Sequence, residues 1–533
     1  MVDSSNNKEN EIIENFFKIK LGDENYDEEL QKAEKFKVEG NNFLKENKFM
    51  QAVDSFTKAV DMKVETLNNA IYLSNRAFIH IKMENFGLAL ADANKAIEID
   101  SNYLKAYYRR ASAHLFLRKY DEALKDLNYV KSHIKEENSD LDEKIKQTIS
   151  ERKKQRFLDS IKSDHSISIQ EEGDIFYKTL NFYDKNPTQP KSKLTYKSDN
   201  AIPNEKQVKL NKTPVEPEIK HNIDIEWVKS LTEEMKSNVF IDKVSLTQMI
   251  YDAKILFDSQ NTLTDITVDE ENDITICGDT HGQFYDLLNI FKINGYPEPK
   301  NMYLFNGDFV DRGSFSVEIV ITLIALKILY PKHFFMSRGN HESKNLNKLY
   351  GFEGEVRSKY DDKMYELFSI LFCSLPLCHV VNKKIFVVHG GLFSKDGVTL
   401  DDIRAIDRHR EPAESGLMCE CLWSDPCKEL GRQPSKRGVG LSFGPDITKK
   451  FLELNNLEMI IRSHEVKQEG YEIDHDGKLV TLFSAPNYCD QMGNKGALVR
   501  YNGKEMKPKY VQFTHVDHPK VPAMKFANPW MMF

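Results

Sequence analysis

Cysteine is scarce in this 533-residue chain. The seven cysteines are Cys277, Cys373, Cys378, Cys419, Cys421, Cys427 and Cys489. Their number is odd and no two of them form a Cys-x-x-Cys pair, so neither a disulfide framework nor a cysteine zinc motif is expected. No cysteine begins a Cys-x5-Arg loop, which argues against an enzyme with a thiolate nucleophile in such a loop. We expect reduced thiols, as in a cytoplasmic or nuclear protein.

Long apolar runs are also missing. The longest, at 319–326 and 370–381, are core-sized, whereas a membrane-spanning helix needs about 20 apolar residues. The acidic N-terminal stretch contains no apolar signal-peptide core and no cleavage signature. A net charge of −8 does not favour nucleic acid as the main partner. The sequence therefore predicts a soluble protein without a transmembrane segment and without a nucleic-acid partner.

What the chain does contain is a series of polar motifs, each directly after a short apolar run. GDTHGQ (278–283), GDFVDRG (307–313) and RGNHE (338–342) follow runs at 274–276, 302–305 and 333–336. Such runs are typical of buried parallel strands. His389 and His464 follow two more runs, at 387–388 and 460–461. Because ligands converge where parallel strands end, and carboxylate, imidazole and amide groups suit Mn, Fe or Zn, the pattern predicts a two-metal hydrolase site.

The same motifs are similar to GD-x-HG, GD-x-VDRG and GNHE of the metallo-dependent phosphoprotein phosphatases, a serine/threonine family. LWSDP (422–426), KRGV (436–439) and SAPNYC (484–489) match as well, so that the resemblance covers about residues 225–515. An ordered set of this kind is far more specific than a lone motif. The resemblance implies an α/β catalytic domain over 223–515, built as a two-sheet β-sandwich flanked by helices.

The resemblance also assigns the metal ligands. Asp279 and His281 would hold one ion, and Asp308 would bridge the two. The ligands of the second ion would be Asn340, His389 and His464. Two such ions lower the pKa of a shared water, and the hydroxide would attack phosphorus directly. We expect Mn, Fe or Zn, with Mn or Mg sufficient in vitro.

Further residues of the motifs are assigned to the substrate. His341 would protonate the leaving oxygen as the general acid, and Asp311 would orient its imidazole. Arg312 and Arg437 would clamp the phosphoryl oxygens, since a guanidinium matches phosphate geometry. Tyr488 would line the same cleft, with a half-buried structural tyrosine as the alternative. The substrate-binding set is thus Arg312, Asn340, His341, Arg437 and Tyr488.

The N-terminal part contains an internal repeat. Alanine anchors Ala52, Ala89 and Ala123 are spaced by 37 and 34 residues, close to the tetratricopeptide period. Each repeat is a pair of antiparallel helices, and three repeats stack into an all-α solenoid with a concave groove. The expected organisation is a disordered acidic tail (1–30), three repeats (31–137), a capping helix (138–164), a partly disordered linker (165–222), the catalytic domain and a C-terminal docking tail (516–533).

Five polar residues of the repeats are expected to line the groove: Lys37, Asn41, Asn75, Lys105 and Arg109. Like charges at i and i+4 repel on a helix, so the last two make most sense with an anion between them. The set resembles the carboxylate clamp of tetratricopeptide domains, which implies the acidic C-terminal tail of heat-shock protein 90 or 70 class chaperones as a partner. The alternative is a solvated basic face.

Tetratricopeptide repeats ahead of this catalytic core resemble the type-five branch of the phosphoprotein phosphatases. The resemblance implies a monomer whose repeats and C-terminal tail cover the active site until a chaperone tail, a fatty acid or both displace them. Glu84, in a turn of the second repeat, would contact the two phosphate-binding arginines as a phosphate mimic. A solvated loop glutamate is the alternative.

Two rival functions share part of this pattern. Another hydrolase on this scaffold, such as a phosphodiesterase or dinucleotide polyphosphatase, would share GD-x-HG and GNHE, but Arg437 in its RGV context and the SAPNYC segment argue against it. A scaffold with a degenerate catalytic half would have lost ligands, and every expected ligand is present. The sequence therefore favours a serine/threonine phosphatase recruited by chaperones.

Overall fold

The computed structural model describes residues 24–62, 67–134, 138–161, 169–187, 192–203 and 217–527. The chain forms two compact units. A helical unit comprises residues 1–163 together with 434–438, and a catalytic unit comprises 164–433 together with 439–533. Of the predicted disordered tail (1–30), residues 1–23 lie outside the described residues, whereas 24–30 differ from the prediction and form the start of helix α2 (Glu24–Lys45). The end of the predicted docking tail, 528–533, also lies outside the described residues.

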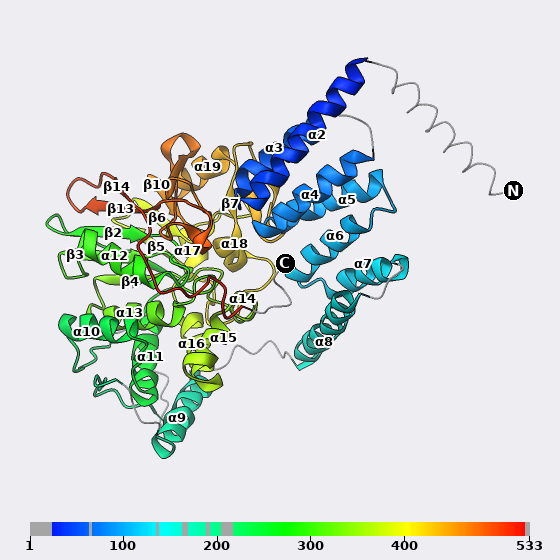
Figure 1. Cartoon of the computed structure of the whole chain (residues 1–533). Helices are drawn as coiled ribbons and strands as arrows, with labels where there is room; N and C mark the ends of the chain where they lie inside the picture. The colour runs from blue at the N-terminus through cyan, green and yellow to red at the C-terminus, as the bar shows by residue number, and fades with distance from the viewer. Residues whose placement is uncertain are drawn as a thin grey trace. The chain divides into compact units, whose positions relative to one another are not determined.

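The helical unit is a series of antiparallel helix pairs, drawn in blue to cyan in Figure 1. Ala52, Ala89 and Ala123 are fully buried, and they lie on the second helix of each pair where small side chains let the helices approach. The helices are α2 (Glu24–Lys45), α3 (Phe49–Asp61), α4 (Asn68–Lys82), α5 (Phe86–Ile99), α6 (Leu104–Phe116), α7 (Tyr120–His133) and α8 (Ser139–Ile161). The predicted all-α repeat region is confirmed.

The repeat is visible in the turns between paired helices. Asn47, Glu84 and Arg118 have φ angles of 57°, 61° and 58°, the left-handed conformation that ends many helices. In each turn the next amide donates back to a carbonyl five residues earlier, as from Asn85 to His80 at 2.8 Å. Glu84 thus lies in the turn that ends α4, the first helix of the second repeat.

An ion pair also recurs with the 34-residue period. Arg76 on α4 donates two hydrogen bonds of 2.7 Å to Asp92 on α5. Arg110 on α6 makes the same pair of bonds, at 2.8 Å, with Asp126 on α7. Both aspartates are almost fully buried, so each bidentate pair satisfies a carboxylate that burial would otherwise destabilise.

The catalytic unit is built on two facing sheets. The first has the order β1-β5-β6-β10-β12-β11 and the second β14-β13-β2-β3-β4; a small third sheet has the order β7-β9-β8. The strands are β1 (Leu263–Ile266), β2 (Asp273–Cys277), β3 (Asn301–Phe305), β4 (Phe334–Met336), β5 (Cys378–Val381), β6 (Ile385–Val388), β7 (Asp425–Pro426), β8 (Arg432–Pro434), β9 (Leu441–Phe443), β10 (Met459–Arg462), β11 (Tyr471–Asp474), β12 (Leu479–Leu482), β13 (Gly496–Asn502) and β14 (Lys509–Phe513). The five apolar runs singled out in the sequence are all strands. The predicted two-sheet α/β fold is confirmed.

Three apolar cores hold these layers together. The inner core joins the sheets through residues such as Ile276, Leu304 and Ile461. Helices cover both outer faces, with α10, α11, α12, α13 and α16 on the second sheet and α18 and α19 on the first. The helices are α9 (Ile169–Lys185), α10 (Ile225–Lys236), α11 (Lys243–Asp258), α12 (Phe284–Asn294), α13 (Ser316–Leu329), α14 (Lys344–Tyr350), α15 (Phe352–Lys359), α16 (Asp362–Ser374), α17 (Leu400–Arg404), α18 (Leu417–Trp423) and α19 (Pro445–Asn455).

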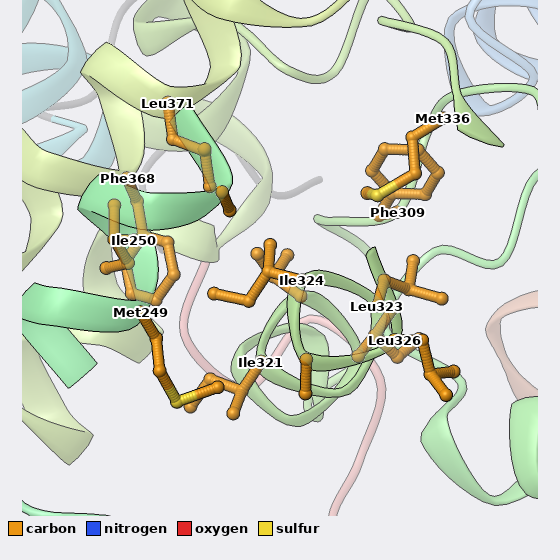
Figure 2. Packing of buried hydrophobic residues seen from close by; sticks show 14 of the residues in the cluster. Met249, Ile250, Phe309, Ile321, Leu323, Ile324, Leu326, Met336, Phe368 and Leu371 are labelled. Atoms are coloured by element: carbon orange, nitrogen blue, oxygen red, sulfur yellow. The ribbon is translucent and has the colours of Figure 1, made fainter. Parts of the chain in front are cut away.

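Helix α13 is the centre of the largest core. Residues 316–328 are all buried, which is expected of a predominantly apolar helix; its buried charges Glu318 and Lys327 are paired with Lys359 and with backbone carbonyls. Figure 2 shows Met249, Ile250 and the α16 side chains Phe368 and Leu371 on one side of it, and Phe309 and Met336 on another.

None of the helices in the described part of the chain combines the length and the apolar character that a membrane crossing requires.

The structure differs from the expectation of a linker over 165–222. Helix α9 belongs to the catalytic unit, and its Phe176 and Tyr183 lie in the same core as α13. Tyr183 donates a 2.6 Å hydrogen bond to Asp361, and Tyr196 donates one of 2.7 Å to Asp252. Residues 165–168, 188–191 and 204–216 of this segment lie outside the described residues. Much of the described part is therefore packed structure.

Candidate active site

The six predicted metal ligands come together at the ends of five strands. They are buried, with exposed fractions of 0–7%: Asp279 and His281 after β2, Asp308 after β3, Asn340 after β4, His389 after β6 and His464 after β10. Strands β2, β3 and β4 are parallel to one another, as are β6 and β10. Their carboxyl ends therefore meet at one edge of the sandwich, where the polar loops converge.

The loops of this edge have unusual backbone geometry. His281, Asp308 and His464 have φ angles of 39°, 54° and 72°, and Asp311 and Arg312 have 70° and 71°. Left-handed conformations are uncommon for residues other than glycine, and they persist where surrounding contacts enforce them. They turn five polar side chains toward the same edge of the sandwich, where the predicted metal ligands lie.

Two glycines allow the loops to touch. A Cβ atom on Gly307 would lie 2.6 Å from the backbone nitrogen of Gly339, and one on Gly339 would lie 2.2 Å from Asp308 Oδ1. Neither position tolerates a larger residue, because the neighbouring atoms are backbone or a ligand. The glycines of the GD and GN dipeptides are thus needed for close approach of the two loops.

Asp308 lies at the centre of the cluster. Its Oδ2 is 3.5 Å from His281 Nε2 and 3.2 Å from His389 Nε2. Two groups of possible metal ligands share this carboxylate: His281, Asp308 and His341 in one, and Asp308, His389 and His464 in the other. A shared carboxylate between two histidine-containing triads is consistent with a dimetal centre.

The histidine tautomers fit cations at this place. His281 Nδ1 donates to Val310 O at 2.9 Å, and His389 Nδ1 donates to Asn306 O at 2.8 Å. Each Nε2 therefore presents a lone pair to the cluster, as in metal sites where a second hydrogen bond fixes the tautomer. His389 Nε2 also lies 2.9 Å from Asn340 Oδ1. An array of inward-facing acceptors is what a divalent ion requires.

The remaining predicted ligand, Asp279, also lies in this cluster, next to His281 and His464. Its Oδ2 is 3.8 Å from His281 Nε2, and its Oδ1 accepts a 3.1 Å hydrogen bond from the backbone of His464. Burial raises the pKa of Asp279 to about 7 and lowers the pKa of His281 to about 3. A bound cation would favour the ionised carboxylate and the neutral imidazole, the forms that ligate metals.

Next to the cluster, His341 and Asp311 form a hydrogen-bonded pair. His341 Nδ1 donates to Asp311 Oδ2 at 2.8 Å, and the two rings of His341 and His281 are 4.7 Å apart. Asp311 also accepts hydrogen bonds from Phe352 N at 2.9 Å and from Asn347 Nδ2 at 3.2 Å. Burial raises the pKa of Asp311 well above its usual range, and these two donors oppose the rise. The arrangement fixes the orientation of the imidazole.

Arg312 is buried and Tyr488 is half-buried beside the same cluster. The Arg312 guanidinium stacks 3.8 Å from the centre of the Tyr350 ring. The Tyr488 ring centre is 5.1 Å from that of His281, and burial raises the pKa of Tyr488 well above its usual range. Arg437 lies in the segment 434–438, which is grouped with the helical unit, so its part in a phosphate clamp stays a prediction.

Glu342 was not among the predicted site residues. Its carboxylate accepts hydrogen bonds from the backbone nitrogens of Asp308 (2.9 Å), Phe309 (2.8 Å) and Gly339 (2.7 Å). It thereby joins the loops after β3 and β4. Its position as the last residue of the GNHE motif was the available signal, but the partners of the carboxylate are apparent only from the folded chain.

Buried histidine–carboxylate triads at the strand ends of a two-sheet α/β sandwich define a metallophosphoesterase. In agreement, the family model described as calcineurin-like phosphoesterase matches residues 273–468. The chain is 45% identical over 502 residues to serine/threonine-protein phosphatase 5 of Homo sapiens, covering 94% of each chain. It is 46% identical over 534 residues to the Arabidopsis thaliana protein of the same name, covering 95% of this chain and 98% of that one.

A solved structure gives the same result for the catalytic part. It is a protein serine/threonine phosphatase from Saccharomyces cerevisiae, described as similar to human phosphatase PP5. It is 40% identical with a TM-score of 0.56, and the match covers 57% of this chain and all of that one. The chain belongs to the serine/threonine-protein phosphatase 5 family, and it is a metal-dependent enzyme that dephosphorylates phosphoproteins.

The shared carboxylate leads to a testable prediction. Replacing Asp308 by Asn removes the charge between both histidine groups, so bound metal should fall from about two ions per chain to fewer than one. Metal content of the purified protein after Mn²⁺ loading and desalting, measured by mass spectrometry, is the readout. Asp407→Asn, at an exposed position outside the site, is the control. Two retained ions in Asp308→Asn would show that Asp308 does not bridge.

Proposed function

We propose that the chain hydrolyses phosphoserine and phosphothreonine by direct attack of hydroxide, with no covalent phosphoenzyme. It acts as a monomer in the cytoplasm or nucleus and holds Mn, Fe or Zn. Its repeats inhibit it, and they recruit it to the acidic C-terminal tails of heat-shock protein 90 or 70 class chaperones, with a fatty acid as an alternative activator. The free thiols among the described residues support a reducing compartment.

One observation supports the catalytic proposal above all others: the His341–Asp311 pair stands directly beside the Asp308 cluster. When bound, the two ions would supply a hydroxide nucleophile at neutral pH and positive charge for the phosphoryl oxygens. Since Nδ1 of His341 donates to Asp311, the other ring nitrogen is the one that can give a proton to the leaving serine or threonine oxygen. Arg312 and Arg437 would hold the phosphoryl oxygens.

His341→Asn tests the general acid. An alkoxide leaving group needs a proton and an aryl oxide needs it less, so kcat on phosphoserine peptides should fall by about 10²–10⁴-fold and kcat on an aryl phosphate clearly less. The two rates are measured with the same Mn²⁺-loaded preparation. Equal losses on both substrates would count against the acid role.

Because His341 also belongs to one group of possible ligands, metal content must be determined in the same variant. Unchanged metal with a selective loss on the alkyl substrate supports the acid. Loss of an ion would instead assign His341 as a ligand. His409→Asn, a half-exposed histidine paired with Asp258 outside the site, serves as the control.

The positions of the five clamp residues support the chaperone proposal. Lys37 and Asn41 are on α2, Asn75 is on α4, and Lys105 and Arg109 are on α6, so all occupy the first helices of their pairs. In tetratricopeptide stacks these helices line the concave groove. Arg109 stacks 4.0 Å from the centre of the Phe78 ring on α4, which holds a cation at this surface.

Lys105→Glu should weaken binding of an acidic peptide with a free C-terminal carboxylate by at least about tenfold, since a charge-assisted hydrogen bond is replaced by repulsion. Calorimetry with the full chain measures the effect. Lys125→Glu makes the same charge change at an exposed position on the second helix α7 and should bind normally. The amidated peptide should bind weakly to the unchanged protein. If Lys105→Glu binds as well as Lys125→Glu, the clamp assignment is wrong.

Inhibition by the repeats can be tested with a fragment that retains α9. Because Phe176 and Tyr183 pack in the catalytic core, the fragment should begin at residue 164 and not near 222. Fragment 164–533 should release phosphate from a phosphoserine peptide several-fold faster than the full chain. Glu84→Gln in the full chain should recover part of that difference. Equal rates for fragment and full chain would mean that the repeats only deliver the enzyme.

A further inference from the structure

The segment after β14 is fastened to the loops of the active site. Val516 N donates to Asp286 Oδ1 at 2.9 Å, and Ser314 Oγ donates to Pro522 O at 2.8 Å. Met524 N donates to the carbonyl of Arg312 at 2.7 Å. In Figure 1 the red end of the chain runs to α14 and α15, where Phe526 lies so close to Gly354 that a Cβ there would be 2.5 Å from Phe526 O.

This segment places a thioether directly on the proposed phosphate-binding arginine. Arg312 Nη1 lies 3.3 Å from Met524 Sδ. Met524 is half-buried as a residue, and its left-handed backbone (φ 58°) and the bond to Arg312 O hold it in place. A thioether is a weak, neutral hydrogen-bond acceptor. It therefore contacts the guanidinium without competing with the anionic oxygens of a substrate.

We propose that Met524 is an oxidation site that controls substrate affinity; the proposal rests on the phosphate-binding role of Arg312. The oxidant is a peroxide. With hydrogen peroxide, the sulfur lone pair attacks one oxygen, the O–O bond breaks and an S–O bond forms; the proton of the transferred hydroxyl passes to the departing hydroxide, which leaves a sulfoxide and one water. Methionine sulfoxide reductases reverse the change.

Oxidation changes the hydrogen-bond acceptor that the Arg312 guanidinium contacts. Its oxygen is a strong acceptor on a polar side chain, and the backbone bond keeps it within reach of the same guanidinium N–H groups. Substrate phosphate must then displace a neutral hydrogen bond before it binds. That cost applies equally to the bound substrate and to the transition state, so KM rises while kcat changes little. A net hydrogen bond of usual strength corresponds to a rise of about five- to tenfold.

The experiment uses the full chain with Mn²⁺ and a phosphoserine peptide. Limited treatment with hydrogen peroxide is followed by a thiol reductant, which reverses sulfenic acids and disulfides, including any at Cys489. Peptide mass spectrometry measures the fraction of Met524 sulfoxide. KM should rise with that fraction, and methionine sulfoxide reductases A and B together should restore it.

The chain offers a matched control. Met506 is also half-buried with a left-handed backbone (φ 49°), and its Sδ likewise lies 3.3 Å from a donor, Asn382 Nδ2. Each variant is compared with its own untreated sample. Met524→Leu should lose the reversible KM effect, and Met506→Leu should retain it. Met524→Gln, which has a carbonyl oxygen near the sulfoxide position, should raise KM without oxidant.

The outcomes distinguish failure of the proposed function from failure of the inference about Met524. If neither the untreated full chain nor fragment 164–533 hydrolyses the phosphopeptide, the proposed function itself fails. If the full chain does, but oxidised Met524→Leu shows the same reductase-reversible rise in KM as the parent protein, Met524 is not the site. A fall in kcat at constant KM, or an unchanged KM in Met524→Gln, would also overturn the inference.

Discussion

The catalytic unit depends on one arrangement: the Asp308 carboxylate is held, almost fully buried, between histidines from different strands. Such a group is unfavourable in a protein interior unless cations and donors surround it. The parallel strands bring those groups to one edge, and left-handed residues turn them inward. Glu342 fixes the loops by accepting three backbone hydrogen bonds. Stability contributed by the apolar cores thus maintains a polar cluster that could not hold itself together.

Much of the fold and of the metal-ligand set was predictable because the sequence signals for them are local. Each ligand follows a short apolar run, so strand, loop and ligand are adjacent in the chain, and the alanine spacing gives the helix pairs directly. The other features need contacts between distant residues. Tyr183 and Asp361 are 178 positions apart, and the lysine- and proline-rich composition around α9 conceals the few aromatic residues that pack. The partners of Glu342 and the contact between Arg312 and Met524, 212 positions apart, likewise appear only after folding.

The helical unit is stabilised in a different way, through contacts that repeat along the stack. Its fully buried alanines allow close packing between helices, while the Arg76–Asp92 and Arg110–Asp126 pairs fix the register of neighbouring helices. Each pair links helices within a repeat, so stability is distributed along the stack instead of residing in one core. The first helices α2, α4 and α6 are thereby presented in a regular series.

The packing of α9 changes how the two units are connected. Helix α8 ends at Ile161 and α9 begins at Ile169, so seven residues, 162–168, separate the last helix of one unit from the first helix of the other. The effective concentration of a tethered domain falls with the length of its tether. With α9 docked, that length is set by these few residues and not by the whole interval up to 222. Any encounter between the two units is then an intramolecular equilibrium governed by a short connection.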